Sequence, residues 1–290
     1  KVQIRVVPEV EGDTHRHIMT GQKDTKFGIP MDAGSIGEAV KRTINSPHLA
    51  LMGFHFHIGS NLYQKEIYIT AVERVMQLCR EMKDQLGWVA RELNTGGGYG
   101  IPYQENDPRY QASHFTKAIM ETVVRCAADL SLEPPAVTIE PGRWIVGEAG
   151  ITLYTVGAEK KIPGLRTYFS VDGGMPDNIR PALYNARYRA VVANKASVPC
   201  TETVTLAGKC CETGDILIWD LKTPPLERGD VVALLHTGAY NESMSNNYNR
   251  LPRPAVVLLS GKEARVMMAR ESYEDLLTRE RRGETWPGND

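Results

Sequence analysis

Five short segments place glycine beside imidazole, carboxylate, guanidinium, thiol or phenol side chains, and each follows a run of apolar residues. They are residues 55–60 (HFHIGS), 94–100 (NTGGGYG), 140–143 (EPGR), 211–215 (CETGD) and 238–240 (GAY). The first three come at the ends of expected parallel strands, where α/β folds place their ligand sites. Together they supply hydrogen-bond donors for a phosphate, a carboxylate and an imidazole, which are the groups needed to hold a phosphorylated aromatic cofactor.

His55 and His57 are two residues apart on an expected strand, so both imidazoles face the same side. Three interpretations are open: a metal-binding pair, an imidazole lying flat against an aromatic ligand, and two hydrogen-bonded histidines of the core. A metal pair needs a further ligand at suitable spacing, and nothing nearby insists on one. We therefore predict no metal site.

The glycines at 96–98 follow another expected strand and let the backbone approach an anion. The segment does not match G-x-G-x-x-G, because Ile101 occupies the place of the last glycine, and the sequence has no Gly-Lys-Ser/Thr of a P-loop. The functional interpretation is a phosphate site, and the alternative is a plain tight turn.

Glu140 and Arg143 end the next expected strand. A carboxylate at this place can pair with a protonated ring nitrogen, and a guanidinium can bind a phosphate. The alternative is a salt bridge that closes a turn, and the residues alone do not decide between the two.

Two pairs in the second half have the chemistry of substrate contacts. Pro181 and the residue spacing predict a short helical turn with Arg180 and Tyr184 on one side, where the arginine either binds a substrate carboxylate or is solvated. Cys211 and Glu212 form a thiol–carboxylate pair in a turn. The cysteine is either a proton donor or a small buried residue beside a surface acid.

The elements that position these groups alternate between strands and helices in the first half of the chain. The expected strands are 2–7, 51–58, 89–93 and 136–140, and the expected helices are 33–44, 66–86 and 115–130. This spacing indicates about four βα units, whereas a closed (β/α)8 barrel needs eight. Either the sheet is open, or the first half of a barrel lies upstream of Lys1, and the immediate start of a strand at Val2 favours the barrel.

After Gly150, short β-rich runs separated by turn residues predict a mostly antiparallel β domain. The expected fold is thus α/β in two domains, a partial (β/α)8 barrel over 1–150 and a β domain over 151–290. In the second domain we expect a terminal helix at 272–282 and strands at 151–158, 167–171, 188–192, 201–206, 216–219, 231–235 and 254–259.

The composition excludes several function classes. The 290 residues have a formal net charge of -1, which gives no electrostatic case for binding nucleic acid or a membrane surface. No apolar run approaches the length of about 18 residues that predicts a membrane span. Five cysteines without C-x-x-C spacing favour a reduced, cytoplasmic protein and argue against a zinc site.

The order of the five segments resembles that of the fold-type III pyridoxal-phosphate decarboxylases. Residues 20–28, 179–184 (IRPALY) and 243–249 (SMSNNYN) are similar to the branch that converts meso-diaminopimelate into L-lysine in lysine biosynthesis, rather than to the ornithine branch. The resemblance covers nearly all of the chain. It implies a (β/α)8 barrel followed by a β domain, pyridoxal 5′-phosphate as cofactor, an amino-acid substrate, and a homodimer with shared active sites.

The resemblance also implies roles for the matching residues. Cys211 and His57 would be catalytic, the cysteine as a proton donor to the active site of the partner subunit, and Arg180, Tyr184 and Glu212 would bind substrate. The cofactor would lie in the first domain, with substrate and dimer contacts in the second. Its ligands would be His57 stacked on the ring, Glu140 on the pyridine nitrogen, and Ser60, Gly97, Gly98, Arg143 and Tyr240 on the phosphate.

One feature of that family is missing. Its Schiff-base lysine lies in a Tyr-x-x-Lys-like strand near the start of the barrel, and no such motif occurs in this sequence. The lysines that are present, such as Lys65 and Lys83, fall on expected solvated helix faces. Together with the number of βα units, this predicts the C-terminal part of a longer enzyme that does not decarboxylate by the usual route as it stands. The alternatives are a decarboxylase of another basic amino acid and a non-catalytic cofactor-binding homologue.

Overall fold

The computed structural model describes residues 1–10, 25–32, 34–281 and 283, and it divides the chain into two compact units, Lys1–Ala149 and Gly150–Asp290. Of the segments named above, residues 20–24, Ala33 and Arg282 lie outside the described residues. Within the part of the chain that is described, no helix combines the length and the apolar character needed to cross a membrane.

The first unit is built on a five-stranded sheet whose paired strands are all parallel. From the second strand onward, each strand is followed by a helix, and this strand–helix pair is the repeating unit of a (β/α)8 barrel. The sheet order is β2-β1-β3-β4-β5, so four strands follow one another in chain order and β2 pairs with the outer side of β1. The strands are β1 (Val2–Val7), β2 (Ile29–Pro30), β3 (Leu51–His55), β4 (Glu92–Asn94) and β5 (Ala136–Thr138).

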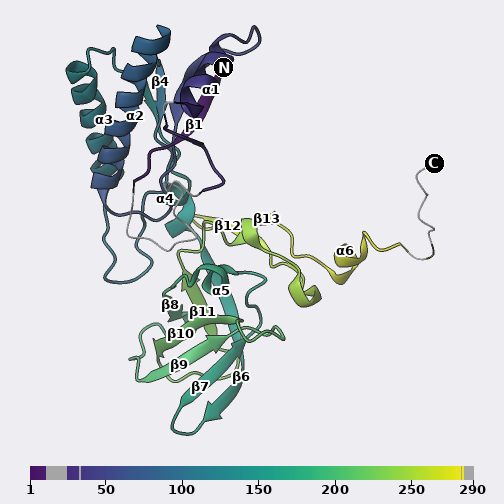
Figure 1. Cartoon of the computed structure of the whole chain (residues 1–290). Coiled ribbons are helices and arrows are strands. Elements are labelled where there is room, and N and C mark those ends of the chain that lie inside the picture. Colours follow the sequence, from purple (N-terminus) through teal and green to yellow (C-terminus); the bar gives the residue numbers. More distant parts are fainter. Residues whose placement is uncertain (11–24, 33, 282, 284–290) are drawn as a thin grey trace. The chain divides into compact units, whose positions relative to one another are not determined.

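The helices of this unit form because their apolar residues recur at helical spacing. Figure 1 shows α2 and α3 running side by side; they are in contact, and their buried residues, such as Val75 and Ile119, belong to one hydrophobic core. Gly87, with a φ of 67°, takes the left-handed conformation that ends α2. The helices are α1 (Ser35–Ile44), α2 (Lys65–Leu86), α3 (Ala112–Asp129), the short α4 (Gly142–Val146) and the 3-10 turn η2 (Gly147–Ala149).

The parallel sheet has one apolar face, which packs against the helices. Ile4, Phe54 and Leu93 pack in or against a single core with the buried side chains of α2 and α3. Because side chains alternate along a strand, the residues next to these three point to the opposite face. The helix-facing side therefore holds the unit together, and the other side is left for polar groups.

That opposite side, which we call the polar face, carries Arg5, His55 and Asn94 in register on neighbouring strands. One layer towards the strand starts, the Gln3 amide donates a hydrogen bond of 2.8 Å to the Glu92 carboxylate. The ordinary interior of a (β/α)8 barrel is filled by branched apolar side chains. The polar face is therefore suited to contact a ligand or water.

The second unit contains a six-stranded sheet in the order β10-β9-β7-β6-β11-β8, in which only β7 and β9 pair in parallel. A separate hairpin of β12 and β13 follows it (Figure 1). The strands are β6 (Ile151–Ile162), β7 (Arg166–Val171), β8 (Ala190–Val192), β9 (Glu202–Ala207), β10 (Ile216–Thr223), β11 (Val231–Leu235), β12 (Val256–Ser260) and β13 (Glu263–Met268). The helical segments are α5 (Arg180–Tyr184), α6 (Tyr273–Leu277), η3 (Ala193–Lys195), η4 (Glu242–Met244) and η5 (Tyr248–Arg250).

Several element boundaries differ from the prediction. Strand β4 starts at Glu92 instead of 89, and β8 starts at Ala190 instead of 188, since only residues 190–192 pair with β11. Helix α6 begins after a capping box of Ser272 and Asp275 and already ends at Leu277, so the terminal helix predicted over 272–282 is too long. The prediction also omitted β2 and β13.

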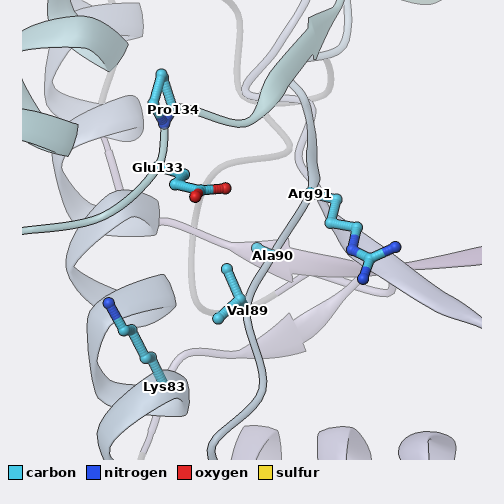
Figure 2. A pocket seen from close by; sticks show the side chains of 6 residues that line it. All are labelled: Lys83, Val89, Ala90, Arg91, Glu133 and Pro134. Carbon is cyan, nitrogen blue, oxygen red and sulfur yellow. The ribbon is translucent and has the colours of Figure 1, made fainter.

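A cavity of about 370 Å³ opens at the amino ends of β4 and β5 (Figure 2). Figure 2 shows the guanidinium of Arg91 extending away from Lys83 and Glu133. In (β/α) folds this end of the strands serves stability, whereas ligands bind at the carboxyl end. The cavity lining contains none of the predicted site residues and consists of Lys83, Val89, Ala90, Arg91, Glu133 and Pro134.

Candidate active site

The predicted cofactor residues of the first unit gather where its parallel strands end. His57 follows β3, Gly97 follows β4 and Glu140 follows β5. The Gly97 N–H donates a hydrogen bond of 3.3 Å to His57 Nδ1, and the Glu140 N–H donates one of 2.7 Å to the Gly96 carbonyl. The structure thus brings three of the five glycine-marked segments to one edge of the sheet.

His57 is a neutral imidazole in this arrangement. Its Nδ1 accepts the Gly97 N–H and therefore carries no proton itself. Burial, with the positive charge of Arg5 and the neighbouring His55 adding to it, lowers the pKa of His57 to about 4. An uncharged ring of this kind can lie against an aromatic ligand without a desolvated charge.

The lowered pKa of His57 predicts a specific loss of stability in acid. The unfolded chain restores a pKa near 6.5, so below that pH the unfolded state binds more protons than the folded state. The contribution of His57 is complete above pH 6.5 and is lost as the pH falls towards 4. Between pH 7 and pH 5 this loss amounts to about 2 kcal/mol.

Urea unfolding at these two pH values measures the effect. In His57→Asn the amide oxygen can still accept the Gly97 N–H, but the titrating group is gone, so the variant should lose less stability than the parent on acidification. His48→Asn removes an exposed imidazole and serves as the matched control. Equal pH dependence in the parent and His57→Asn would contradict the assignment.

Glu140 is oriented by a side chain that the sequence patterns did not single out. The Asn94 amide donates a hydrogen bond of 2.9 Å to Glu140 Oε1, and its own oxygen accepts the Gly96 N–H at 2.9 Å. His55 Nε2 lies 3.8 Å from the same carboxylate oxygen and is buried, with no hydrogen bond among the described residues. The Glu140 side chain keeps 54% of its surface exposed, so a ligand can still reach it.

Arg143 supplies positive charge next to this carboxylate segment. It lies in α4, only 6% of its surface is exposed, and its Nη2 donates a hydrogen bond of 2.7 Å to Ser60 Oγ. Its Nη1 donates to the hydroxyl of Tyr103 at 2.5 Å, a residue that the sequence patterns also missed. Guanidinium and hydroxyl donors held together in this way are suited to a phosphate.

The glycines at 96–98 have a packing role that neither interpretation of the sequence anticipated. A Cβ on Gly97 would lie 1.9 Å from the Glu140 carbonyl oxygen, and one on Gly98 would lie 2.0 Å from that of Gly59. Gly96, with a φ of +65°, is in the left-handed region and lies against the Phe56 carbonyl. Glycine is therefore required here because the three strand-end segments contact one another through their backbones.

In the second unit, Arg180 is buried and held by aromatic residues. Its Nη1 donates a hydrogen bond of 2.7 Å to the Tyr188 hydroxyl, and its guanidinium carbon lies 5.9 Å from the centre of the Tyr240 ring. Helix α5 places Tyr184 four positions further along, as predicted. Tyr188 was predicted only as part of a strand, and its contact with Arg180 shows that it shapes this guanidinium site.

Cys211 and Glu212 lie beside the later segment 243–249. The Cys211 N–H donates a hydrogen bond of 2.8 Å to Asn249 Oδ1, and the Tyr248 hydroxyl donates one of 3.3 Å to Glu212 Oε2. Cys211 is an exposed free thiol, so the alternative of a small buried cysteine is wrong. A thiol at the surface is available for proton transfer.

Residues 1–147 match the family model for the pyridoxal-binding domain of pyridoxal-dependent decarboxylases. The chain belongs to this family. It is 46% identical to the diaminopimelate decarboxylase of Bacillus subtilis over 95% of this chain and 63% of that protein. It is 42% identical to the diaminopimelate decarboxylase of Staphylococcus aureus over 96% of this chain and 65% of that protein. The chain thus spans less than two thirds of the length of these pyridoxal-dependent decarboxylases.

Solved structures of the family give the same result. A crystal structure of diaminopimelate decarboxylase from M. jannaschii in complex with L-lysine has a TM-score of 0.86 and 35% identity, covering 96% of this chain and 62% of that one. The Helicobacter pylori diaminopimelate decarboxylase complexed with L-lysine has a TM-score of 0.83 and 32% identity, covering 95% and 65%. These likenesses confirm the predicted fold class, part of a (β/α)8-type barrel followed by a mostly antiparallel β domain.

The residues at the strand ends fit the pyridoxal group of this family. The neutral His57 suits an aromatic ring, and the Glu140 carboxylate, fixed by Asn94 but still exposed, suits a ring nitrogen. Arg143 and Ser60, already joined by a hydrogen bond, suit a phosphate. The buried His55 Nε2, which makes no hydrogen bond to any residue that the structure describes, adds a polar atom beside the Glu140 carboxylate.

Proposed function

We propose that this chain binds pyridoxal 5′-phosphate at the carboxyl ends of β3, β4 and β5 and serves the decarboxylation of meso-diaminopimelate to L-lysine. The observation that carries the proposal is that the same strand ends hold two prepared groups. One is the Glu140 carboxylate, oriented by a hydrogen bond from Asn94, and the other is the buried Arg143 guanidinium, hydrogen-bonded to Ser60 and suited to a phosphate. The similarity to diaminopimelate decarboxylases over nearly all of this chain supports the choice of substrate.

The strand-end site residues of the first unit each have a part in holding the cofactor. Arg143 and Ser60 bind its phosphate, with the glycine segment alongside, and Glu140 accepts a hydrogen bond from the protonated pyridine nitrogen. When bound, the cofactor supplies an electron sink for the bond that loses its carboxyl group. Glu140 sustains that capacity because its negative charge keeps the ring nitrogen protonated, and the uncharged His57 packs on the ring.

The second unit supplies the substrate contacts in this proposal. Arg180, whose guanidinium is already oriented by Tyr188, binds the distal carboxylate of the substrate together with Tyr184. Fixing that distal end turns the scissile bond into the productive orientation. Cys211 then donates a proton and Glu212 contacts the substrate, both in the active site of a partner subunit, which makes the homodimer part of the proposal.

Three further assignments remain predictions. The first is Tyr240 as a phosphate ligand. The second is the division of roles, with cofactor binding in the first unit and substrate and dimer contacts in the second. The third is the cytoplasmic location, and all three rest on the sequence. The covalent bond with the cofactor also needs a lysine, and the family's Tyr-x-x-Lys-like motif is absent from the 290 residues.

The proposal is tested first by cofactor binding. We expect the purified chain to bind pyridoxal phosphate, followed by its absorbance band, and absence of binding at micromolar cofactor would overturn the proposal. Borohydride treatment followed by intact mass then shows whether a lysine of this chain bonds to the cofactor. Retained cofactor mass means that a lysine of this chain bonds to it, and cofactor that washes away means that the chain supplies only non-covalent contacts.

Product analysis tests the substrate. If the borohydride test shows that a lysine of this chain bonds to the cofactor, a separate, unreduced preparation with pyridoxal phosphate should convert meso-diaminopimelate into L-lysine, and ornithine, lysine and arginine should react much more slowly. Faster reaction with ornithine would show that Arg180 does not bind a distal carboxylate. Tight cofactor binding without product from any of these amino acids would favour the non-catalytic homologue.

A further inference from the structure

Asp215 is a buried carboxylate to which none of the roles above is assigned. Only 3% of its surface is exposed, and its two oxygens accept hydrogen bonds from two different loops. Oδ1 accepts the N–H of Met175 at 2.7 Å, and Oδ2 accepts the N–H of Cys210 at 2.8 Å. Ionised acceptors make the stronger class of hydrogen bond, so one side chain ties both loops together.

The glycines around Asp215 show that the backbone closes tightly on its carboxylate. A Cβ on Gly208 would lie 2.1 Å from Oδ2, and a Cβ on Gly174 would lie 2.5 Å from Oδ1. The Lys209 N–H also donates a hydrogen bond of 3.1 Å to the Gly173 carbonyl. The two loops are therefore joined directly as well as through the carboxylate.

Both loops lead straight to proposed substrate contacts. Met175 lies five residues before Arg180, at the start of α5, and Cys210 immediately precedes Cys211. A third segment joins them, because the Asn246 N–H donates to the Pro176 carbonyl at 2.9 Å and Asn249 accepts the Cys211 N–H. Asp215 is thus the point at which the segments carrying these side chains are held together.

We propose that Asp215 is the positioning residue for the substrate contacts of the second unit, setting the place of the Cys211–Glu212 turn relative to the start of α5. The inference rests on the proposed function for its meaning in catalysis. The coupling itself depends only on the contacts of the second unit. Loss of the Asp215 carboxylate should release the Cys211–Glu212 turn and leave cofactor binding by the first unit unchanged.

The reactivity of the Cys211 thiol measures this coupling without any turnover. Chain carrying Cys200→Ser has one exposed thiol, since Cys79 and Cys126 are buried. Burial and the neighbouring Asp215 raise the pKa of Cys210 to about 12, so iodoacetamide at pH 8 reports on Cys211. Because Cys210 and Cys211 are adjacent, fragmentation of the peptide that begins at Cys210 assigns the alkyl group to one or the other in every variant, which matters most in Asp215→Asn, where Cys210 loses the neighbouring carboxylate.

Two variants disturb the carboxylate in different ways. Asp215→Asn turns one acceptor into a donor that faces a backbone N–H, and Gly208→Ala pushes a methyl group against the carboxylate while keeping its charge. Both should speed alkylation of Cys211 by about fivefold, because the exposed thiol is no longer held in one position and can be reached from more directions once a hydrogen bond of this kind is lost. Asp220→Asn, which alters an exposed ion pair with Arg166, should leave the rate unchanged.

A core variant of the same unit separates positioning from general destabilisation. Leu234→Ala lowers the unfolding midpoint through a fully buried site and should not change the alkylation rate well below that midpoint. If Asp215→Asn and Gly208→Ala behave like Leu234→Ala, the inference is wrong. If alkylation speeds up but no variant, nor the parent, binds pyridoxal phosphate, the coupling stands and the proposed function fails.

Discussion

Arg143→Ala is expected to weaken the binding of pyridoxal phosphate by about a hundredfold. The guanidinium is buried and bonded to Ser60, so its loss removes charge-assisted hydrogen bonds to the phosphate, worth about 1.5–3 kcal/mol each. It also leaves the Ser60 hydroxyl without this donor. Titration of the cofactor against the chain, followed by absorbance, gives the ratio of dissociation constants.

Matched variants identify the cause of that loss. Arg109→Ala removes an exposed guanidinium of the same unit, paired with Glu148, and should leave the dissociation constant unchanged. Tyr103→Phe keeps the ring and removes only the hydroxyl that receives Arg143 Nη1, so a loss of about fivefold is expected. An Arg143→Ala variant that binds as tightly as the parent would place the phosphate elsewhere.

Gly97→Ala is expected to destabilise the first unit by about 3 kcal/mol, because the new methyl group has no room. Its Cβ would lie 1.9 Å from the Glu140 carbonyl oxygen, which is backbone and cannot turn aside like a side chain. The strand ends must move apart, and Glu140 moves with them. Urea unfolding measures the stability, and cofactor titration measures the displacement of the carboxylate.

Gly142→Ala is the matched control for that experiment. Nothing lies within 4 Å of a Cβ at Gly142, and the residue begins α4, so the change should be neutral or stabilise by up to about 1 kcal/mol. Equal losses in the two variants would mean that the close contact between Gly97 and Glu140 does not determine the stability.

The helices and the strand-end segments could be predicted from local patterns. Apolar residues at helical spacing marked α2 and α3, and glycines after apolar runs marked the segments around His57, Gly97 and Glu140. Such patterns depend only on neighbours in the sequence, and they predict where a chain must bury or bend. The end of β6 escaped prediction because the charged residues Glu159, Lys160 and Lys161 interrupt the apolar pattern, although all three pair with β7.

The partners of the site residues could not be found in this way. Asn94 meets Glu140 from 46 positions away, and Tyr103 meets Arg143 from 40. Neither contact leaves a periodic signal, because it exists only after neighbouring parallel strands have aligned. Asp215 was quoted as the end of a motif, yet its significance is visible only when the loop at Met175 folds back onto it.

The two faces of the parallel sheet have a practical consequence for redesign. Side chains that fasten the helices, such as Ile4 and Phe54, alternate along the strands with side chains of the polar face, such as Arg5 and His55. A combinatorial library confined to the polar face can therefore vary ligand chemistry while every anchoring residue stays fixed. Because of the alternation, the residues that determine ligand specificity and the residues that stabilise the fold are different positions of the same strands. New specificities can therefore be selected at small risk to the stability of the unit.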